Sequence, residues 1–502
     1  MRVALAALLL ALSACARLPD VERTQSSALA DTATTRLGKA LAGAVKAHPG
    51  KSGIHALASG RDAFAARVLL ARAAERSLDV QYYILRADTT GGLLCEALWQ
   101  AAERGVRVRL LLDDNNTKGL DDAIAALDAH PNIEVRLFNP YVSRGFRLGD
   151  LTTDFSRLNR RMHNKSFTAD NQATIVGGRN IGDEYYGAES AVEFADLDAL
   201  AVGAVVAEVS ASFDAYWNSA SAYPAEALIG APRPGSAERV RAAWSKLNAE
   251  PQAARYVEAL RSTPLVQQLV AGSLPLDWAL ARVVSDDPAK VLHPPERRDL
   301  HMLQKLEAAL GVPRSELDLV SPYFVPTEDG TATLVAIAAR AKVRVLTNSL
   351  AATDVAPVHA GYAKYRETLL RGGVKIFELK RSPRTEDDDR PERRGGSSDT
   401  SLHAKTFGVD RNRIFIGSFN FDPRSARLNT EMGLMIESPR LAARLAEVLD
   451  QALPRDAYEV RLRDNKLEWI EGETRHTSEP NTGFFRRMWI GFLSILPIEW
   501  LL

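Results

Sequence analysis

The hydrophobic pattern of the chain occurs twice, in the same order. In the first half, an apolar, an amphipathic and a second apolar segment cover residues 78–85, 91–105 and 106–114. In the second half, the same three kinds of segment cover residues 317–326, 329–341 and 342–350. Near-continuous apolar runs are typical of strands covered on both faces, and helical spacing of apolar positions predicts a helix between them. Each half therefore predicts a strand–helix–strand unit.

A further apolar run follows each unit, NIEVRLFN at residues 132–139 and GVKIFEL at residues 373–379. The duplicated order indicates an α/β fold with two similar domains, which we place at residues 60–222 and 301–455. Residues 223–300 between them are polar with a helical pattern. We expect a helical connecting segment there.

The N-terminus has the pattern of a processed leader. Residues 1–14 combine a basic start with a short apolar run, which is typical of a signal peptide. The sequence LSAC resembles the bacterial lipoprotein processing box, in which Cys15 becomes the lipidated first residue. We therefore expect a membrane anchor at Cys15, followed by a linker with a helix at residues 15–59.

The C-terminal tail, residues 456–502, ends in GFFRRMWIGFLSILPIEWLL. This stretch is rich in aromatic and aliphatic side chains, but Pro497 and Glu499 interrupt it and it is short for a membrane span. We predict that it lies in the membrane interface. The alternative is that the tail packs on the protein's own core.

The composition limits the classes of function. The 502 residues carry 63 basic and 63 acidic side chains, so the formal net charge is zero. A neutral chain lacks the general electrostatic attraction to nucleic acid, and no nucleic-acid partner is expected. The chain has two cysteines. With Cys15 acylated no internal disulfide can form, and we expect Cys95 to be a core residue on a helix.

The candidate chemistry lies in a second repeat. MHNKSFTADNQATIVGGRN (residues 162–180) and LHAKTFGVDRNRIFIGSFN (residues 402–420) share one template: H-x-K, four residues, Asp, six residues, G-[GS]-x-N. The residues concerned are His163, Lys165, Asp170 and Asn180 in the first copy and His403, Lys405, Asp410, Ser418 and Asn420 in the second. Because side chains alternate across a strand, the His and the Lys of each copy share one face.

Two such sets facing each other would suit a phosphate group. Ammonium and amide donors bind an anion with several oxygens, one imidazole can attack phosphorus, and the other can protonate the departing alkoxide. A carboxylate downstream in each half, Glu431 or Asp196, is the candidate for orienting an imidazole, with Asp198 as an alternative to Asp196. We expect no metal, because a lysine beside each histidine would repel a dication. His359 is predicted to lie on a helix surface, outside the catalytic set.

The two templates resemble the signature of the phospholipase D superfamily. Segments such as GGRNIGDEYY, FADLD and GSFNFDPRSARLNTEMG resemble its bacterial cardiolipin synthase branch. The resemblance implies two α/β/α domains with mixed central sheets packed face to face and the active site at their interface. It implies a phosphohistidine on one motif histidine, general acid–base catalysis by the other, and no cofactor. Asp170 and Asp410 are expected to support the structure around the site.

The resemblance also implies the substrate class. We expect a phosphatidyltransferase that makes cardiolipin from two phospholipids on a membrane surface, in the bacterial cell envelope, as a lipoprotein facing the periplasm. A phospholipase D that uses water or a small alcohol is the alternative, ahead of a nuclease or an inactive membrane-tethered scaffold. The motifs do not tell the inner from the outer membrane or whether an accessory protein is needed. Family precedent favours His163 as the nucleophile, although the near-symmetry of the motifs does not assign the roles.

Overall fold

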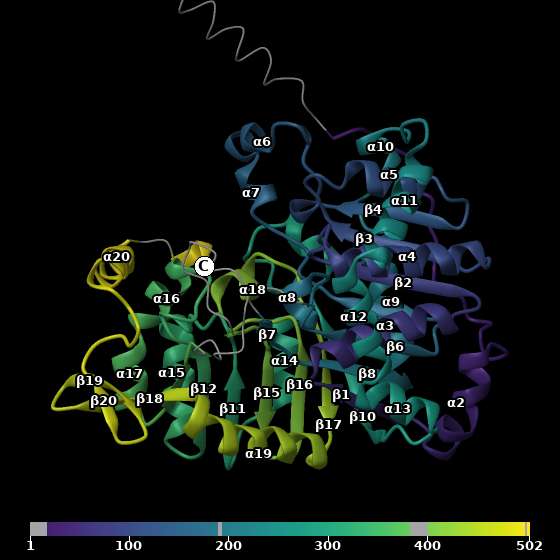
Figure 1. The fold of residues 1–502 in the computed structure, drawn as a ribbon. Helices are drawn as coiled ribbons and strands as arrows, with labels where there is room; N and C mark the ends of the chain where they lie inside the picture. The colour runs from purple at the N-terminus through teal and green to yellow at the C-terminus, as the bar shows by residue number, and fades with distance from the viewer. Residues whose placement is uncertain (1–17, 189–192, 382–399, 497–498) are drawn as a thin grey trace, which may run out of the picture.

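The computed structural model describes residues 18–188, 193–381, 400–496 and 499–502. The predicted signal peptide, Cys15 and Pro497 lie outside these residues. The described chain forms two α/β halves, each with a mixed sheet between helices (Figure 1). The fold class predicted from the repeated pattern is confirmed.

The first half contains the predicted strand–helix–strand unit as β2 (Ser77–Tyr82), α4 (Thr89–Glu103) and β3 (Arg107–Asp113). β3 continues in parallel to β4 (Ile133–Phe138), whose other neighbour is the short β9 (Ala222–Pro224). On the other side of β2 the pairing is antiparallel, through β5 (Ser166–Ala169), β6 (Ala173–Gly177), β8 (Asp198–Gly203) and β1 (Ser52–Leu57). The sheet is therefore mixed, with its parallel part formed by the repeated unit.

The second half repeats this topology and adds two strands, β19 (Lys466–Glu471) and β20 (Thr474–His476), at its edge. The parallel strands are β11 (Glu316–Val320), β12 (Lys342–Asn348) and β13 (Lys375–Leu379). The antiparallel strands beyond β11 are β15 (Thr406–Val409), β16 (Arg413–Gly417), β17 (Met432–Glu437) and β10 (Asp277–Ser285). Beyond β13 lie β18 (Ala457–Arg463), β19 and β20.

Helices cover both faces of each sheet. In the first half, α3 (Gly60–Ala73) and α4 pack on one face, and α9 (Val205–Trp217) packs on the other. In the second half, α15 (Thr327–Ala338) and α17 (Arg366–Arg371) contact the sheet together, and α19 (Pro439–Asp456) covers the strands that carry the second motif. Apolar side chains of β6, β8 and α9 form one cluster with those of β16, β17 and α19. This cluster joins the two halves.

Five strands lie where the pattern did not predict them. β1 falls within residues 15–59, after helix α2 (Arg36–Ala47), and β18 to β20 fall within the tail. β10 lies in the segment predicted to be helical, after α11 (Ser236–Ala249), α12 (Pro251–Arg261) and α13 (Pro264–Val270). β10 pairs with β1 through its first residues and with β17 through the rest, so it joins the two sheets. Leu280 and Arg282 of β10 are exposed, whereas Ala279 and Val284 are buried.

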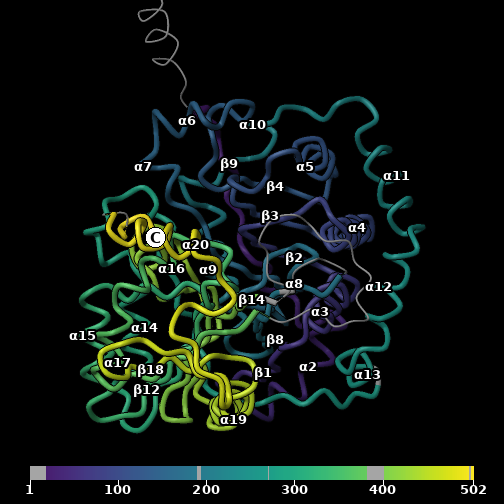
Figure 2. Tube along the Cα trace, turned by 60° about the vertical axis from the view of Figure 1, so that its left-hand side comes forward, coloured from purple at the N-terminus to yellow at the C-terminus, as the bar shows by residue number. Residues whose placement is uncertain are grey.

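The C-terminal helix of the tail is buried on one face and exposed on the other. Helix α20 (Phe484–Ile495) packs on α16 (Ala356–Ala363), and Ile490 and Leu493 are buried against Leu350 and Ala360. Figure 2 shows α20, α16 and the C-terminus together at one side of the molecule. Among the described residues, no helix has the length and apolar character needed to cross a membrane.

Candidate active site

The two motif copies meet at the contact between the halves, and each is held by the other half. The backbone N–H of His163 donates to the carbonyl of Thr430 (2.8 Å), whose own N–H donates to the carbonyl of Arg161 (2.9 Å). In the other copy, β14 (Thr400–Leu402) pairs in parallel with β7 (Glu193–Ala195). The N–H of His403 then donates to the carbonyl of Ala195 (2.9 Å). The backbone of one half thus fixes the histidine of the other.

The imidazole–carboxylate pairs are exchanged between the halves in the same way. Nδ1 of His163 lies 2.8 Å from Oε2 of Glu431, and Nδ1 of His403 lies 2.6 Å from Oδ2 of Asp196. Both carboxylates are buried and both histidines are about nine-tenths buried. Asp198, the alternative to Asp196, pairs instead with Arg67 at 2.9 Å. Because Nδ1 is held by a carboxylate, Nε2 is the ring nitrogen able to meet a ligand.

The two lysines crowd the same buried space. Nζ of Lys165 donates to the carbonyl of His163 (2.5 Å), and Nζ of Lys405 lies 2.9 Å from Nδ1 of His403. Burial lowers the pKa of Lys165 to about 7 and that of Lys405 to about 8. Burial, partly offset by Glu431, lowers the pKa of His163 to about 4. Burial and the nearby Lys405 lower the pKa of His403 well below its ordinary value. Cations that lose charge when buried together are a suitable environment for an anion, which would restore both ammonium charges.

The two carboxylates have different surroundings. Glu431 accepts hydrogen bonds from the hydroxyls of Ser418 (2.5 Å) and Ser425 (2.8 Å). Burial alone would raise the pKa of Glu431, but the nearby His163 and these hydrogen bonds bring it below its ordinary value. Burial raises the pKa of Asp196, which accepts from the N–H of Leu197 (2.8 Å). Glu431 is therefore the better stabilised anion of the two.

The two motif asparagines also differ. The Asn180 side chain accepts from the N–H of Ile84 (3.2 Å) and donates to the hydroxyl of Tyr185 (2.9 Å). Oδ1 of Asn420 is buried and has no hydrogen-bond partner within the described part of the chain. Asn180 is therefore committed to protein contacts, whereas the amide of Asn420 keeps unused hydrogen-bonding capacity.

The motif aspartates lie away from the histidines, at the opposite ends of their strands. Asp170 accepts hydrogen bonds from the backbone N–H groups of residues 75–77, at the start of β2. Asp410 does the same for residues 314–316, at the start of β11. Both have positive φ values, near 50°, which suits Asp in a tight turn. Their geometry is that of turn supports.

Sequence reasoning missed the side chains that surround the histidines. Tyr83 meets the ring of His163 edge-on at 5.1 Å between centroids, and Tyr185 meets His403 in the same way at 5.1 Å. Phe194 stacks on His403, also at 5.1 Å. Aligning the two repeats would have drawn attention to Tyr83, since a tyrosine follows the first strand in both halves, in QYY and in SPY.

A buried ion pair supports the backbone of Glu431. Asp286 accepts from the N–H of Glu431 (2.7 Å) and pairs with Lys290 at 3.0 Å. Lys290 also donates to the carbonyl of Ser425 (3.0 Å). Lys290 is buried and neutralises a carboxylate that the fold buries beside the site.

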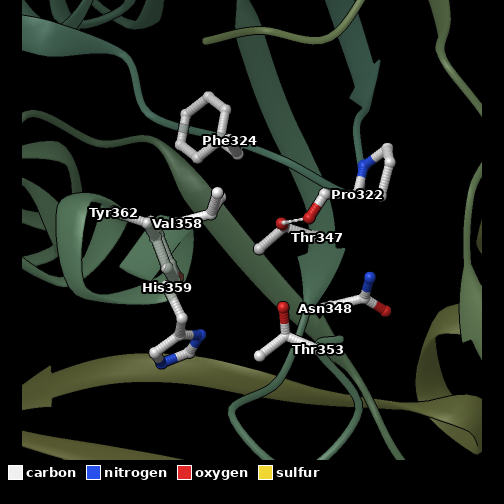
Figure 3. A pocket seen from close by; sticks show the side chains of 8 residues that line it. All are labelled: Pro322, Phe324, Thr347, Asn348, Thr353, Val358, His359 and Tyr362. Carbon is white, nitrogen blue, oxygen red and sulfur yellow. Dashed lines mark hydrogen bonds between the residues drawn. The ribbon is translucent and has the colours of Figure 1, made fainter. Parts of the chain in front are cut away.

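A small pocket lies behind β14, beside the second motif. Its lining includes Asn348, whose side-chain amide exchanges two hydrogen bonds of 3.0 Å with the backbone of Leu402. Figure 3 shows the ring of His359 at its margin near Thr353. The prediction that His359 is a surface residue is wrong. It is buried, with Nε2 held by Arg366 at 3.0 Å, while Nδ1 has no partner among the described residues.

Comparison with known proteins identifies the class. The family model described as "Cardiolipin synthase, PLD-like domain" matches the chain twice, at residues 69–217 and 304–453. A crystal structure of phosphatidylserine synthase from Haemophilus influenzae Rd KW20 shares the fold, with a TM-score of 0.58 and 13% identity over 93% of this chain and all of that one. The chain therefore belongs to the phospholipase D-like family that includes the cardiolipin synthases.

Within this family the similarity is closer to particular members. Cardiolipin synthase C of Escherichia coli (strain K12) is 48% identical over 477 residues, which cover 93% of this chain and 100% of that protein. Cardiolipin synthase A of Pseudomonas aeruginosa is 26% identical over 79% of this chain and 66% of its own length. The resemblance inferred from the duplicated motif is confirmed.

Proposed function

We propose that the protein is a phosphatidyltransferase that makes cardiolipin from two phospholipids. The observation that carries the proposal is the exchange of imidazole–carboxylate pairs between two halves that share one buried, lysine-lined site. Similarity to cardiolipin synthase C along nearly the whole of both chains supports the lipid substrate. The reaction takes place in two half-reactions, with the two histidines in different roles.

In the first half-reaction, Nε2 of His163 attacks the phosphorus of the donor phospholipid. A P–N bond forms, the P–O bond to the headgroup breaks, and protonated His403 gives its proton to the departing alkoxide. His163 enters this step neutral, because its lowered pKa of about 4 leaves the imidazole unprotonated near neutral pH. Burial and the neighbouring Lys405 also lower the pKa of His403 well below its ordinary value, so the proton that it donates is held there by Asp196 and by the negative charge of the bound phosphate. The Nδ1 proton stays on the side of Glu431, whose anion stabilises the positive ring of the phosphohistidine.

In the second half-reaction, His403 accepts the proton of a headgroup hydroxyl on a second phospholipid. The oxygen attacks phosphorus, the new P–O bond forms, and the P–N bond breaks, which returns His163 to its starting state. Lys165 and Lys405 hold the non-bridging oxygens in both steps, as preorganised positive charges. The surroundings of the carboxylates support these roles, since the pKa of Glu431 is lowered and two serine hydroxyls bind it, whereas burial raises the pKa of Asp196.

The test is incubation of the purified protein with defined phospholipid pairs, followed by mass spectrometry of the products. We expect cardiolipin that carries the acyl chains of both added lipids, and none from the His163→Asn variant. Phosphatidic acid as the main product would instead identify a hydrolase that uses water. Cleavage of a nucleic acid with no lipid turnover would overturn the proposal.

We also propose that the protein acts in the bacterial cell envelope as a lipoprotein facing the periplasm, attached through Cys15. The LSAC sequence after a short apolar run supports this. The Cys15→Ser variant should lose incorporation of labelled fatty acid while keeping its activity on a water-soluble substrate. Absence of label in the unaltered protein would sink the lipoprotein proposal and leave the assignment of the active site untouched.

A further inference from the structure

Large apolar side chains are exposed on two elements that are far apart in the sequence. One is the pair of short helices α6 (Arg147–Thr153) and α7 (Phe155–Leu158), and the other is α20 with the final turn η4 (Glu499–Leu501). The exposed side chains are Phe146, Leu148 and Phe155 on the first and Phe484, Phe485, Met488, Trp489, Phe492, Ile495 and Trp500 on the second. Every Phe or Trp that is exposed in the described part of the chain belongs to this set, which we call the apolar rim.

A single guanidinium ties the two parts of the rim together. Arg424 donates to the carbonyl of Asn159, directly after α7, at 3.0 Å and to the Asn159 side chain at 2.9 Å. The guanidinium of Arg424 also donates to the carbonyl of Leu501 at 3.0 Å. The backbone N–H of Arg424 donates to the carbonyl of Leu502 at 2.6 Å. The end of α7 and the C-terminus are therefore neighbours, although more than 300 residues separate them in the sequence. Figures 1 and 2 both show α6, α7 and the C-terminus on the side of the molecule away from α19.

The rim borders the active site. Arg424 lies in α18 (Pro423–Arg427), and the next residue, Ser425, donates to the carboxylate of Glu431 at 2.8 Å. On the other part of the rim, α7 leads within a few residues to Arg161 and His163. A ligand lying on the rim is thus adjacent to the elements that hold the nucleophile's imidazole–carboxylate pair.

The outer face of α20 is left free by its own packing and carries positive charge. Ile490 and Leu493 hold the inner face on α16, so the aromatic face points away from the protein. Arg486 and Arg487 lie in the first turn of α20 and donate to the carbonyls of Thr353 and Thr482. Within the described residues neither forms an ion pair with a carboxylate. An apolar helix face flanked by uncompensated arginines suits anionic phospholipid.

We propose that the apolar rim is a docking surface for an anionic phospholipid bilayer, with α6–α7 as a second point of contact beside the C-terminal helix. The proposal rests on the proposed function, because a lipid substrate must pass from the bilayer into a buried site. Two contacts on either side of α18 set the orientation of the protein as well as its affinity. The mouth of the site then faces the headgroups, and donor and acceptor lipids enter without leaving the membrane.

The start of the described chain lies on the same side. Arg23 stacks on Tyr223 and donates to the carbonyl of Ala222 in β9 (3.1 Å). The adjoining carbonyl of Ser221 accepts from Asn139, whose side chain binds the carbonyl of Arg157 in α7. A lipid anchor at Cys15, eight residues before Arg23, can reach the same bilayer because eight extended residues span roughly 25 Å.

The experiment uses the full chain with Cys15→Ser, so that acyl chains do not dominate binding, and vesicles that contain phosphatidylglycerol. The Phe146→Asp/Leu148→Asp variant should bind the vesicles at least ~10-fold more weakly, since a buried side chain of this size contributes a factor of roughly 10 to 100. The matched control is Val448→Asp on α19, which replaces a similarly exposed apolar residue on the opposite side and should bind as before. Vesicles with brominated acyl chains should quench Trp489 and Trp500, and the Trp489→Phe/Trp500→Phe variant should lose this quenching.

Activity on a short-chain, monomeric phospholipid separates this proposal from the proposed function. We expect kcat/KM on that substrate to be unchanged in the Phe146→Asp/Leu148→Asp variant. Equal vesicle binding by this variant and the parent would overturn docking by α6–α7, as would an equal loss in the Val448→Asp control. A change in oligomeric state without a change in vesicle binding would show that a second copy covers the rim, and would also overturn it. Failure of the unaltered protein on the monomeric lipid would count against the proposed function alone.

Discussion

The two half-sites share one sequence motif but differ in what surrounds it. His163 is held by Glu431, which two serine hydroxyls bind, and His403 is held by Asp196, which lies against a glycine. The second glycine position of the template, G-[GS], is Ser418 in the second copy, and its hydroxyl is one of the two that bind Glu431. In the other copy a Cβ on Gly178 would lie 2.2 Å from Oδ1 of Asp196, so no side chain fits. A duplicated motif can therefore divide two chemical roles through the residues around it.

A second difference lies in the residues that hold the backbone next to each motif histidine. Asp113 ends β3 and accepts from the N–H of Met162 (2.8 Å) and from the buried guanidinium of Arg161 (2.9 Å). The equivalent residue of β12 is Asn348, which binds the backbone before His403 with a neutral amide. The first copy is anchored by charge and the second by neutral hydrogen bonds.

The largest effect should separate the two histidines. His163→Asn should form no covalent intermediate with any donor and should show no turnover, because the atom that attacks phosphorus is missing. His403→Asn should also fail with phospholipids, but should still form phosphohistidine from a donor with a nitrophenyl leaving group, which needs no protonation. Denaturation and mass spectrometry of the trapped protein would measure this. Label on residue 403 and not on residue 163 would reverse the two roles.

The next largest effects should come from replacing the two carboxylates that bind the histidines. Glu431→Gln should lower kcat by roughly 10³–10⁴, the size of losing a carboxylate that orients a catalytic imidazole. The step that Glu431→Gln slows should be the formation of the phosphohistidine. Asp196→Asn should leave that step intact with a nitrophenyl donor and slow the transfer to the acceptor. Single-turnover kinetics resolve the two steps. Identical behaviour of both variants would mean that the half-sites are functionally equivalent.

A smaller pair of effects should come from the variable motif position. Gly178→Ala should displace Asp196 and cost about 10² in rate, as a misplacement of about 1 Å can. Ser418→Ala should cost roughly 10-fold, because it removes one hydrogen bond to an anion of about 1.5–3 kcal/mol, part of which Ser425 retains. Thermal melting of both variants checks that the fold survives. Full activity of Gly178→Ala would show that Asp196 has room to move.

The smallest effect should be a shift in pH dependence. The ammonium groups must be charged to bind phosphate, so kcat/KM should fall as the pH rises through the lowered pKa values, about 7 for Lys165 and about 8 for Lys405. Lys165→Arg should move this limb up by about one pH unit, because arginine stays charged. Lys405→Arg should leave it near pH 7. An unchanged alkaline limb in both variants would assign it to another group.

Much of this protein could be predicted from its sequence, for identifiable reasons. Apolar runs such as LDVQYYIL are strand signals in themselves. The spacing of H-x-K predicted that His and Lys share one face of a strand, but β5 and β15 begin only after Lys165 and Lys405. The choice of Glu431 and Asp196 was also open to sequence reasoning, since a buried imidazole needs an acceptor. β10 was missed because its partners β1 and β17 lie more than 100 residues away in the sequence, so that its place in the sheets depends on the tertiary fold.

The sequence by itself determined the repeated α/β unit and the two motif copies that supply the candidate reacting groups, because both depend on local spacing. Only the tertiary structure decided which carboxylate serves which histidine. That pairing is exchanged, Glu431 with His163 and Asp196 with His403, across two halves joined by β10. Contacts between residues some 200 or more positions apart are set by how sheets pack, and sequence spacing carries no record of them. The same holds for the apolar rim, where Arg424 brings α7 to the C-terminus.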